Sequence, residues 1–368
     1  MEKSRKPKIR FRGYTDDWEQ RKLGEVVEFL DTMRKPLEGT KRSKGPYPYY
    51  GASGIVDYVD GYLFDEELIL LSEDGANIMD RNYPVCFLAS GKYWVNNHAH
   101  VLKVKQGNEN SFVCNSLERK DYSYYNTGMA MPKLNKETCR NIIVTCSSFE
   151  EQKIIGDCFR KLEKLITLHQ RKLDKLINVK KSMLEKMFPK QGSTVPEIRF
   201  TGFTNDWEQR KLNEFTKYSS SSLTVKDIDE TASYDLYDAN EEIGKTDKSP
   251  LFDDYISIIK DGAGVGRVRK LPKNTSVLGT MGAIIPQNSD YNFLFSILEK
   301  TDFTKLTSGG TIPHIYYNQY GEKVYSIPTL EEQQKIGQYF RNLDNLITLH
   351  QCELEKLQNI KKSMLEKM

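Results

Sequence analysis

Two long segments of the chain carry apolar residues at alternating steps of four and three positions. A spacing of this kind, sustained over about five heptads, is typical of a helix that buries one stripe in a coiled coil. We therefore predict one long amphipathic helix in residues 149–190 and another in residues 330–368. The predicted seam contains Ile155, Phe159, Leu162, Ile166, His169, Leu173 and Leu176 in the first helix, and Ile336, Phe340, Leu343, Ile347, His350, Leu354 and Leu357 in the second.

Both helices have recognisable start signals. Ser148 with Glu151, and Thr329 with Glu332, fit the spacing of a capping box. Pro189 is expected to end the first helix. A helix of some 38 residues would extend about 57 Å.

The segments between the helices show short β-rich runs instead. Such runs occur at 68–72, 84–90 and 100–104, and again at 255–259 and 275–285. Turn residues separate them, which favours a mixed α/β domain in each segment.

The chain is internally repeated. Residues 9–23 and 198–212 are identical at 12 of 15 positions, and residues 149–187 and 330–368 at 26 of 39. The intervening segments look largely unrelated, apart from two echoes: Asp74-Gly75-Ala76 resembles Asp261-Gly262-Ala263, and Pro132 corresponds to Pro313 in its distance from the following helix. The repeated segments, which we call the frame, therefore flank two inserts of unlike sequence.

This order predicts the domain organisation. We expect a first domain at 1–148, a constant helix at 149–190, a second domain at 191–329 and a second constant helix at 330–368. Each helix needs a partner for its stripe, and an antiparallel pair would give an α+β fold with pseudo-twofold symmetry. His169 and His350 near the helix centres could form a pH-sensitive or catalytic pair, but polar seam residues more commonly set register.

Composition narrows the class of protein. The 368 residues are 38% hydrophobic and 29% charged, as in soluble globular proteins. We find no apolar run of membrane-spanning length and no signal peptide, so a cytoplasmic protein is expected. The six cysteines show no metal-ligand spacing, and no metal site is predicted.

The net charge of +3 is uninformative by itself, but its distribution is uneven. The first helical segment, residues 149–190, has 11 basic and 6 acidic residues. This excess could mark a solvated face or a surface for a phosphate backbone.

The repeated motifs resemble those of a known family. DWEQRKL before each insert, EEQxxIG at each helix start, LITLHQ in each helix and KKSMLEKM at its end are similar to the specificity subunit of type I restriction–modification enzymes. The resemblance covers nearly the whole chain. The second repeat departs from the first by ending without a counterpart of Phe188-Pro189-Lys190.

The resemblance implies two target-recognition domains, each reading half of a split, asymmetric site in double-stranded DNA, with the helices as a ruler between them. It implies two partner modification subunits that methylate adenine, joined by restriction subunits that cut and translocate DNA. S-adenosylmethionine, ATP and magnesium are expected on those partners, and no cofactor is expected on this chain.

The chain itself carries little sign of catalysis. The Asn-Pro-Pro-aromatic motif of adenine methyltransferases is missing from the sequence. Gly244-Lys245-Thr246 lacks the earlier glycine of a phosphate loop, and the glycine run from Gly262 to Gly266 suits a turn better than a nucleotide site. We therefore expect a non-catalytic protein.

Candidate DNA contacts lie where basic residues, amides and hydroxyls stand beside aromatics and glycines. In the first domain they are Arg34, Lys35, Lys41, Arg42, Lys44, Tyr47, Ser72, Asn77, Lys92, Asn96 and Asn97. In the second they are Lys260, Arg267, Arg269, Lys270, Ser308 and Thr311. For the tyrosines the alternative is an ordinary core position, and for the charges a solvated loop.

Two other functions remain open from the sequence. A coiled-coil scaffold with two protein-binding modules would share the repeat but would lack salt-dependent DNA binding. A stand-alone nuclease or methyltransferase would need motifs that the sequence lacks.

Overall fold

The computed structural model describes residues 6–39, 42–190, 192–310 and 312–367. The chain forms two compact units. Unit 1 contains Met1–Gln170 and Cys352–Met368, and unit 2 contains Arg171–Gln351. Each of the two long helices therefore begins in one unit and ends in the other. Both combine helices with open sheets, so the prediction of an α+β fold is confirmed.

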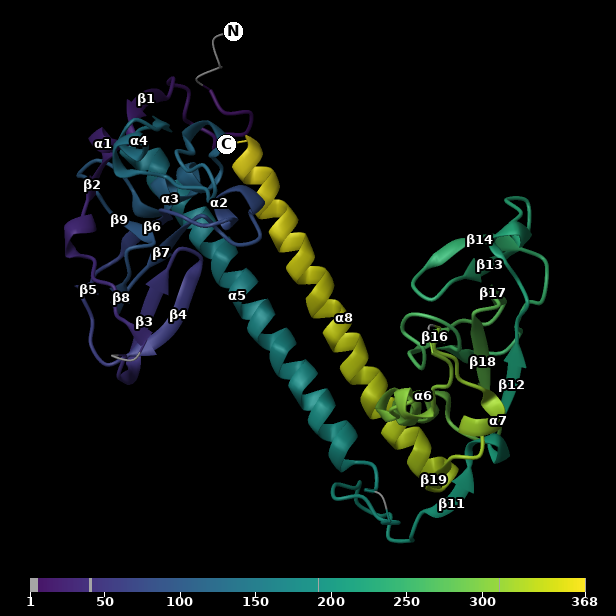
Figure 1. Cartoon of the computed structure of the whole chain (residues 1–368). Coiled ribbons are helices and arrows are strands. Elements are labelled where there is room, and N and C mark those ends of the chain that lie inside the picture. Colours follow the sequence, from purple (N-terminus) through teal and green to yellow (C-terminus); the bar gives the residue numbers. More distant parts are fainter. Residues whose placement is uncertain (1–5, 40–41, 191, 311, 368) are drawn as a thin grey trace. The chain divides into compact units, whose positions relative to one another are not determined.

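Figure 1 labels strand β1 and the first long helix, α5, of this part of the chain. The globular part of unit 1 begins with β1 and ends with strand β10, immediately before α5. Its elements are β1 (Glu19–Lys22), α1 (Leu23–Val26), β2 (Val27–Phe29), η1 (Asp31–Met33), β3 (Lys44–Gly51), β4 (Gly54–Val59), β5 (Phe64–Asp65), β6 (Leu68–Ser72), α2 (Asn77–Asp80), β7 (Cys86–Ala89), β8 (Lys92–Val95), β9 (Ala99–Val104), α3 (Asn110–Glu118), η3 (Ser123–Tyr125), α4 (Lys136–Arg140), β10 (Ile143–Cys146) and α5 (Phe149–Lys186).

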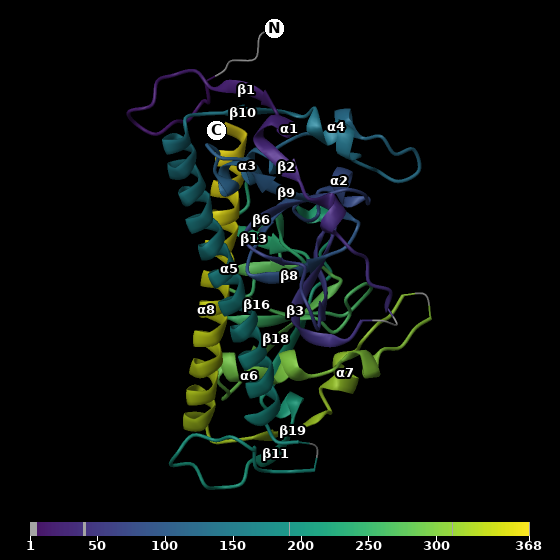
Figure 2. The same cartoon turned by 90° about the vertical axis from the view of Figure 1, so that its left-hand side faces the viewer.

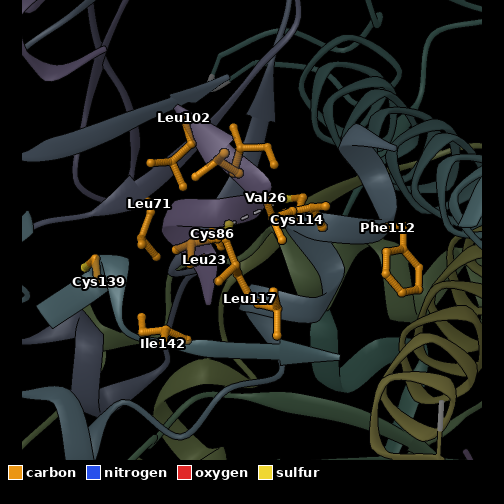
Figure 3. Packing of buried hydrophobic residues seen from close by; sticks show 14 of the residues in the cluster. Leu23, Val26, Leu71, Cys86, Leu102, Phe112, Cys114, Leu117, Cys139 and Ile142 are labelled. Carbon is orange, nitrogen blue, oxygen red and sulfur yellow. Dashed lines mark hydrogen bonds between the residues drawn. The ribbon is translucent and has the colours of Figure 1, made fainter. Parts of the chain in front are cut away.

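The strands of unit 1 form three sheets, with the orders β2-β9-β6-β7, β4-β3-β8-β5 and β1-β10. Strand β6 lies inside the first sheet and is buried along its whole length, which explains its uninterrupted apolar run. Leu71 of β6, Leu102 of β9 and Leu117 of α3 belong to one buried cluster (Figure 3). The β-rich runs predicted in this domain are confirmed as β6, β7 and β9.

Unit 2 follows a similar order of elements, without counterparts of β5 and α2 among its described residues, and its β-rich runs are also confirmed as strands. The elements are β11 (Glu208–Lys211), η4 (Leu212–Glu214), β12 (Thr216–Ser220), η5 (Val225–Asp227), β13 (Tyr234–Tyr237), β14 (Glu242–Thr246), β15 (Tyr255–Ile259), β16 (Val268–Leu271), β17 (Thr275–Val277), β18 (Met281–Pro286), α6 (Tyr291–Lys300), η6 (Thr304–Leu306), α7 (Tyr317–Tyr320), β19 (Val324–Ile327) and α8 (Leu330–Lys367). Its sheets are β12-β18-β15-β16, β14-β13-β17 and β11-β19.

The two inserts therefore have closely similar topologies, although their sequences are largely unrelated. Sheet β2-β9-β6-β7 corresponds to β12-β18-β15-β16, and helix α3 to α6. The lead-in strands pair in the same register, Glu19 opposite Cys146 and Glu208 opposite Ile327. Burial requires apolar character on one face of each strand, so many sequences satisfy one topology.

The two long helices begin at Phe149 and Leu330, as predicted. The predicted capping boxes are wrong in one respect: Ser148 Oγ accepts from the amide of Glu151 at 3.4 Å, but the Glu151 carboxylate turns to other partners. Among the described residues, no helix is both long enough and apolar enough to cross a membrane.

The ends of the two helices pack together within each unit. In unit 1, Lys361 Nζ lies 3.0 Å from Glu163, and Met364 packs on the core that contains Phe159. In unit 2, Lys180 Nζ lies 2.8 Å from Asp344. Figure 2 shows the beginning of α5 near the end of α8 in unit 1. The predicted seam positions are buried or half-buried along both helices.

Candidate nucleic-acid interface

A buried carboxylate ties each lead-in segment to the start of the long helix. In unit 1, Arg10 donates two hydrogen bonds to Glu151, at 2.7 and 2.8 Å, and Trp18 Nε1 donates a third at 3.2 Å. In unit 2, Arg199 donates to Glu332 at the same two distances. Both glutamates are buried, so the Arg–Glu pair is one clamp that is used twice. The tryptophan contact is specific to unit 1, because the buried Trp207 Nε1 has no hydrogen-bond partner among the described residues of unit 2.

The next constant residue fixes the first helix of each variable insert. Gln152 Oε1 accepts from the amide of Glu109 at 3.0 Å, and Gln333 Oε1 accepts from the amide of Asp290 at 3.0 Å. Glu109 and Asp290 are the N-caps of α3 and α6. A constant side chain thus holds the same point of two unlike domains.

The glycine of EEQxxIG leaves room for these N-caps. A Cβ on Gly156 would overlap the Glu109 carboxylate, and one on Gly337 would overlap Asp290 Oδ1. Any other residue would push the N-cap away. The constant motif EEQxxIG is therefore a socket, made of Glu151, Gln152 and Gly156 in unit 1 and of Glu332, Gln333 and Gly337 in unit 2.

Several predicted DNA contacts in unit 1 are engaged inside the domain. Arg34 donates to Glu73 at 2.6 Å and to the Ala99 carbonyl at 2.7 Å. Ser72 is buried and donates to the Ala52 carbonyl at 2.6 Å. A side chain held in this way stabilises the scaffold of the surface and does not project from it.

Two of the predicted asparagines also shape loops. Asn77 accepts from the amide of Tyr83 at 2.8 Å, and Asn96, which is buried, accepts from the amide of His98 at 2.8 Å. Asn97, the neighbour of Asn96, is exposed. Of these residues, Asn97 is the one placed to meet a ligand.

Other predicted residues gather on the β4-β3-β8-β5 sheet. Lys92 Nζ lies 4.8 Å above the ring of Tyr62, which packs 5.2 Å from the ring of Tyr47. Arg42 covers the ring of Tyr49 at 4.7 Å and reaches Asp57 at 3.4 Å. The exposed cations of this surface are Lys35, Lys44 and Lys92; Lys41 lies outside the described residues.

A buried ionic network, which the sequence analysis missed, supports the Asn96–Asn97 loop. His100 Nδ1 faces Asp31 at 2.8 Å and Nε2 faces the Leu134 carbonyl at 2.8 Å, so both ring nitrogens meet acceptors. Burial lowers the pKa of His100, but hydrogen bonds to Asp31 and Cys139 outweigh it and raise the pKa to about 10. Burial raises the pKa of Asp31, yet His100 and Arg34 bring it below its usual value.

This network predicts a pH-dependent stability. His100 titrates at about 10 in the fold against 6.5 ordinarily, so its contribution is complete below pH 6.5 and disappears as pH rises toward 10. Asp31, whose pKa is lowered from 3.8, contributes above that value and loses its contribution in acid. We expect His100→Gln to cost ~3–5 kcal/mol below pH 6.5 and progressively less above it.

Thermal unfolding of the variant and the parent protein across this pH range measures the difference. His98→Gln is the control, because His98 also faces a carboxylate, Asp74, but is half-exposed. A difference between parent and His100→Gln that stayed constant with pH would contradict a charged His100.

In unit 2 the predicted basic residues divide between two faces of β16. Arg267 and Arg269 donate to the loop at Asn240, the latter to its carbonyl at 2.8 Å. Lys270 points to the other side, where it lies 3.0 Å from Asn292 and 3.5 Å from Asp344, and burial lowers its pKa. Lys270 therefore joins the ion pairs around the long helices.

The remaining predicted residues of unit 2 lie near the end of β15 and the Pro313 loop. Ser308 is exposed, and Thr311 lies outside the described residues. Lys260 lines an open hollow of about 350 Å³ with Tyr218, Tyr316, Tyr317 and Asn318. The rings of Tyr218 and Tyr317 stack at 4.5 Å.

The aromatic part of this hollow was missed at the sequence level. Its one signal was the Tyr316-Tyr317 pair three residues after Pro313. The lining also includes Asp261, whose carboxylate faces His314 at 2.6 Å. The aromatic walls and the amide of Asn318 suit contact with a nucleotide base.

Comparison with known proteins identifies relatives along most of the chain. Residues 15–178 and 204–359 match the family model described as type I restriction modification DNA specificity domain. The putative type I restriction enzyme specificity subunit S.HindORF215P of Haemophilus influenzae is 36% identical over 124 residues, which is 34% of this chain and 32% of that protein.

One further relative and one solved structure are similar along nearly their whole length. The type I restriction enzyme MjaVIII specificity subunit of Methanocaldococcus jannaschii is 23% identical, over 95% of this chain and 91% of that protein. The crystal structure of the type I restriction–modification system S subunit from M. genitalium superimposes with a TM-score of 0.76 at 15% identity, covering 98% of both chains. That structure shares the fold described above.

Proposed function

Because the chain belongs to the type I restriction–modification DNA specificity family, we propose that it is the non-catalytic subunit that selects the DNA site for such an enzyme. Each variable domain would read one half of a split, asymmetric site. The observation that carries the proposal is the duplicated socket: one constant motif holds two domains that share a topology but differ in their exposed residues.

The surfaces of the two domains support reading of different half-sites. Unit 1 offers Lys35, Lys44, Lys92 and Asn97, whereas unit 2 offers the exposed Arg267 and the tyrosine-lined hollow at Lys260. Cations suit phosphate contact, and amides, arginine and aromatic side chains suit base edges and faces. Unlike surfaces on a shared frame favour an asymmetric site.

The long helices would set the distance between half-sites as an antiparallel coiled coil. Two ion pairs support this pairing. Glu163 and Asp344 occupy the same position of the repeat, as do Lys180 and Lys361, and each lysine contacts the acid of the opposite helix. Reciprocal contacts of this kind are expected of a pseudo-twofold pair.

The exposed faces of these helices support binding of two copies of one partner. Leu165 and Leu168 on α5 are 43% and 58% exposed, and their repeats Leu346 and Leu349 on α8 are 42% and 53% exposed. Exposed apolar side chains that recur in both copies of a repeat mark a protein interface. We assign these leucines to contacts with two modification subunits. S-adenosylmethionine, ATP and magnesium would be bound by the modification and restriction subunits and not by this chain.

Replacing these leucines should prevent assembly. We expect the Leu168→Asp and Leu349→Asp double variant to lose co-purification with the modification subunit. A leucine that becomes buried in the interface contributes about 1.5–3 kcal/mol to the free energy of binding, and burial of an aspartate there is unfavourable. Single variants should leave one modification subunit bound, as measured by the mass of the complex.

The control for this test is Lys164→Asp with Asn345→Asp, at exposed repeat-equivalent positions beside the leucines. Normal assembly of the leucine variant, or equal loss in the control, would argue against this interface.

DNA binding separates the proposal from the alternative of a coiled-coil scaffold with protein ligands. We expect the complex with modification subunits to bind a split-site duplex with an affinity that falls roughly 10³–10⁵-fold between about 50 and 200 mM salt, as for 6–10 phosphate contacts. A scaffold would show no such binding. Absence of salt-dependent DNA binding by the assembled complex would refute the proposed function.

A further inference from the structure

The two short sequences that remain alike in the unlike domains lie in contact. In unit 1 the amide of Gly75, from Asp74-Gly75-Ala76, donates to the Pro132 carbonyl at 3.0 Å. In unit 2 the amide of Gly262 donates to the Pro313 carbonyl at 3.0 Å. The echoes are thus two halves of one structural feature, which occurs once in each unit.

Each contact holds a narrow loop that precedes the proline. In unit 1, Asn126 Oδ1 accepts from the amides of Gly128 and Lys133, both at 2.9 Å, and closes the loop. In unit 2, Ser308 and His314 exchange backbone hydrogen bonds at 2.8 and 2.9 Å. We call residues 127–133 and 308–314 the tip loops, the latter described apart from position 311.

Both tip loops require glycine at the same position. A Cβ on Gly128 would overlap the Met131 carbonyl, and one on Gly309, which has φ +97°, would lie 2.5 Å from the Ile312 carbonyl. The loop backbone is therefore tightly turned in both domains. The frame is the same, but the residues that it displays differ.

The displayed residues are apolar and exposed. Met129 is fully exposed, Met131 is 61% exposed, and Ile312 at the equivalent position is 55% exposed. An apolar side chain that is exposed to water does not stabilise the fold through burial. A rigid loop that exposes such side chains therefore suits contact with a binding partner.

The base of each tip loop carries a histidine that faces a carboxylate, and a lysine. His98 Nδ1 lies 2.8 Å from Asp74, and His314 Nδ1 lies 2.6 Å from Asp261. Lys133 at the end of the first loop is half-exposed and lies 3.8 Å from Glu73. Lys260 joins the base of the second loop, where its carbonyl accepts from the amide of Ile315. An apolar tip above basic groups is complementary to a nucleic-acid groove between its phosphates.

We propose that the tip loops enter a groove of the DNA, one in each half-site, and place Met129 and Met131 or Ile312 against base edges. This inference rests on the proposed function and names a part of its reading surface. Apolar side chains distinguish thymine by its methyl group or wedge between base steps. Tip loops with similar backbones but different side chains would then recognise different bases in the two half-sites.

The test uses the complex with modification subunits and a duplex carrying the split site that the parent complex methylates. We expect Met129→Ala with Met131→Ala to weaken binding about tenfold or more and to relax base preference in the first half-site only. The control is Ile143→Ala on β10, an exposed apolar residue outside the loop, which should bind as the parent does.

Three outcomes would overturn the inference. Parent-like affinity and base preference in the double variant would show that the tip does not read DNA. Loss of the modification subunits from that variant would assign the loop to a protein contact. A parent complex that reads no split site would refute the proposed function itself, which separates that failure from a failure of the tip loops alone.

Discussion

Exchange of residues 213–329 for the corresponding insert of another family member should change one half of the methylated DNA site completely and leave the other half unchanged. The exchange keeps Glu332, Gln333 and Gly337, together with Arg199 that binds Glu332, so the socket of unit 2 stays intact. An incoming insert needs an acidic N-cap at the position of Asp290, because that carboxylate fits against Gly337.

The measurement is the pattern of methylated adenines on genomic DNA treated with each hybrid complex. The matched experiment exchanges residues 24–148 and should change the opposite half-site. A hybrid that altered both halves, or neither, would show that the inserts do not read DNA independently.

Glu151→Ala should destabilise unit 1 by ~3–5 kcal/mol. The substitution leaves the Arg10 guanidinium without its carboxylate and Trp18 Nε1 without its acceptor at a site where Glu151 is fully buried. Thermal unfolding measures the loss, and Glu151→Gln should recover part of it, because an amide oxygen still accepts from Trp18.

Glu150→Ala is the control for this variant. Glu150 precedes Glu151 in the same helical turn, but 71% of its side chain is exposed, so its replacement should change stability by no more than about 0.5 kcal/mol. Equal shifts for the two alanine variants would contradict the clamp.

The sequence predicted the frame of the molecule well, because periodicity and repetition are properties of neighbouring residues. The helix starts at Phe149 and Leu330 and the strand from Leu68 to Ser72 follow from such patterns. The capping box was misassigned because its motif cannot show that Arg10, 141 positions away, competes for the Glu151 carboxylate.

The candidate site was less predictable for the same reason. Arg34 and Lys270 are residue types expected to contact DNA, but each forms an ion pair with a residue far away in the sequence. Arg34 pairs with Glu73, and Lys270 pairs with Asp344. The echoes at Asp74 and Pro132 were visible in the sequence, yet their contact depends on the fold. Charge and residue type identify candidates, and tertiary partners decide which of them reach the surface.

Mapping of methylated adenines on DNA exposed to the chain in complex with its modification subunits tests the central claim most directly. The proposed function predicts one asymmetric motif of two specified half-sites separated by a fixed number of unspecified base pairs, and no methylation when the chain is omitted. A continuous or palindromic motif, or methylation that does not depend on this chain, would contradict it.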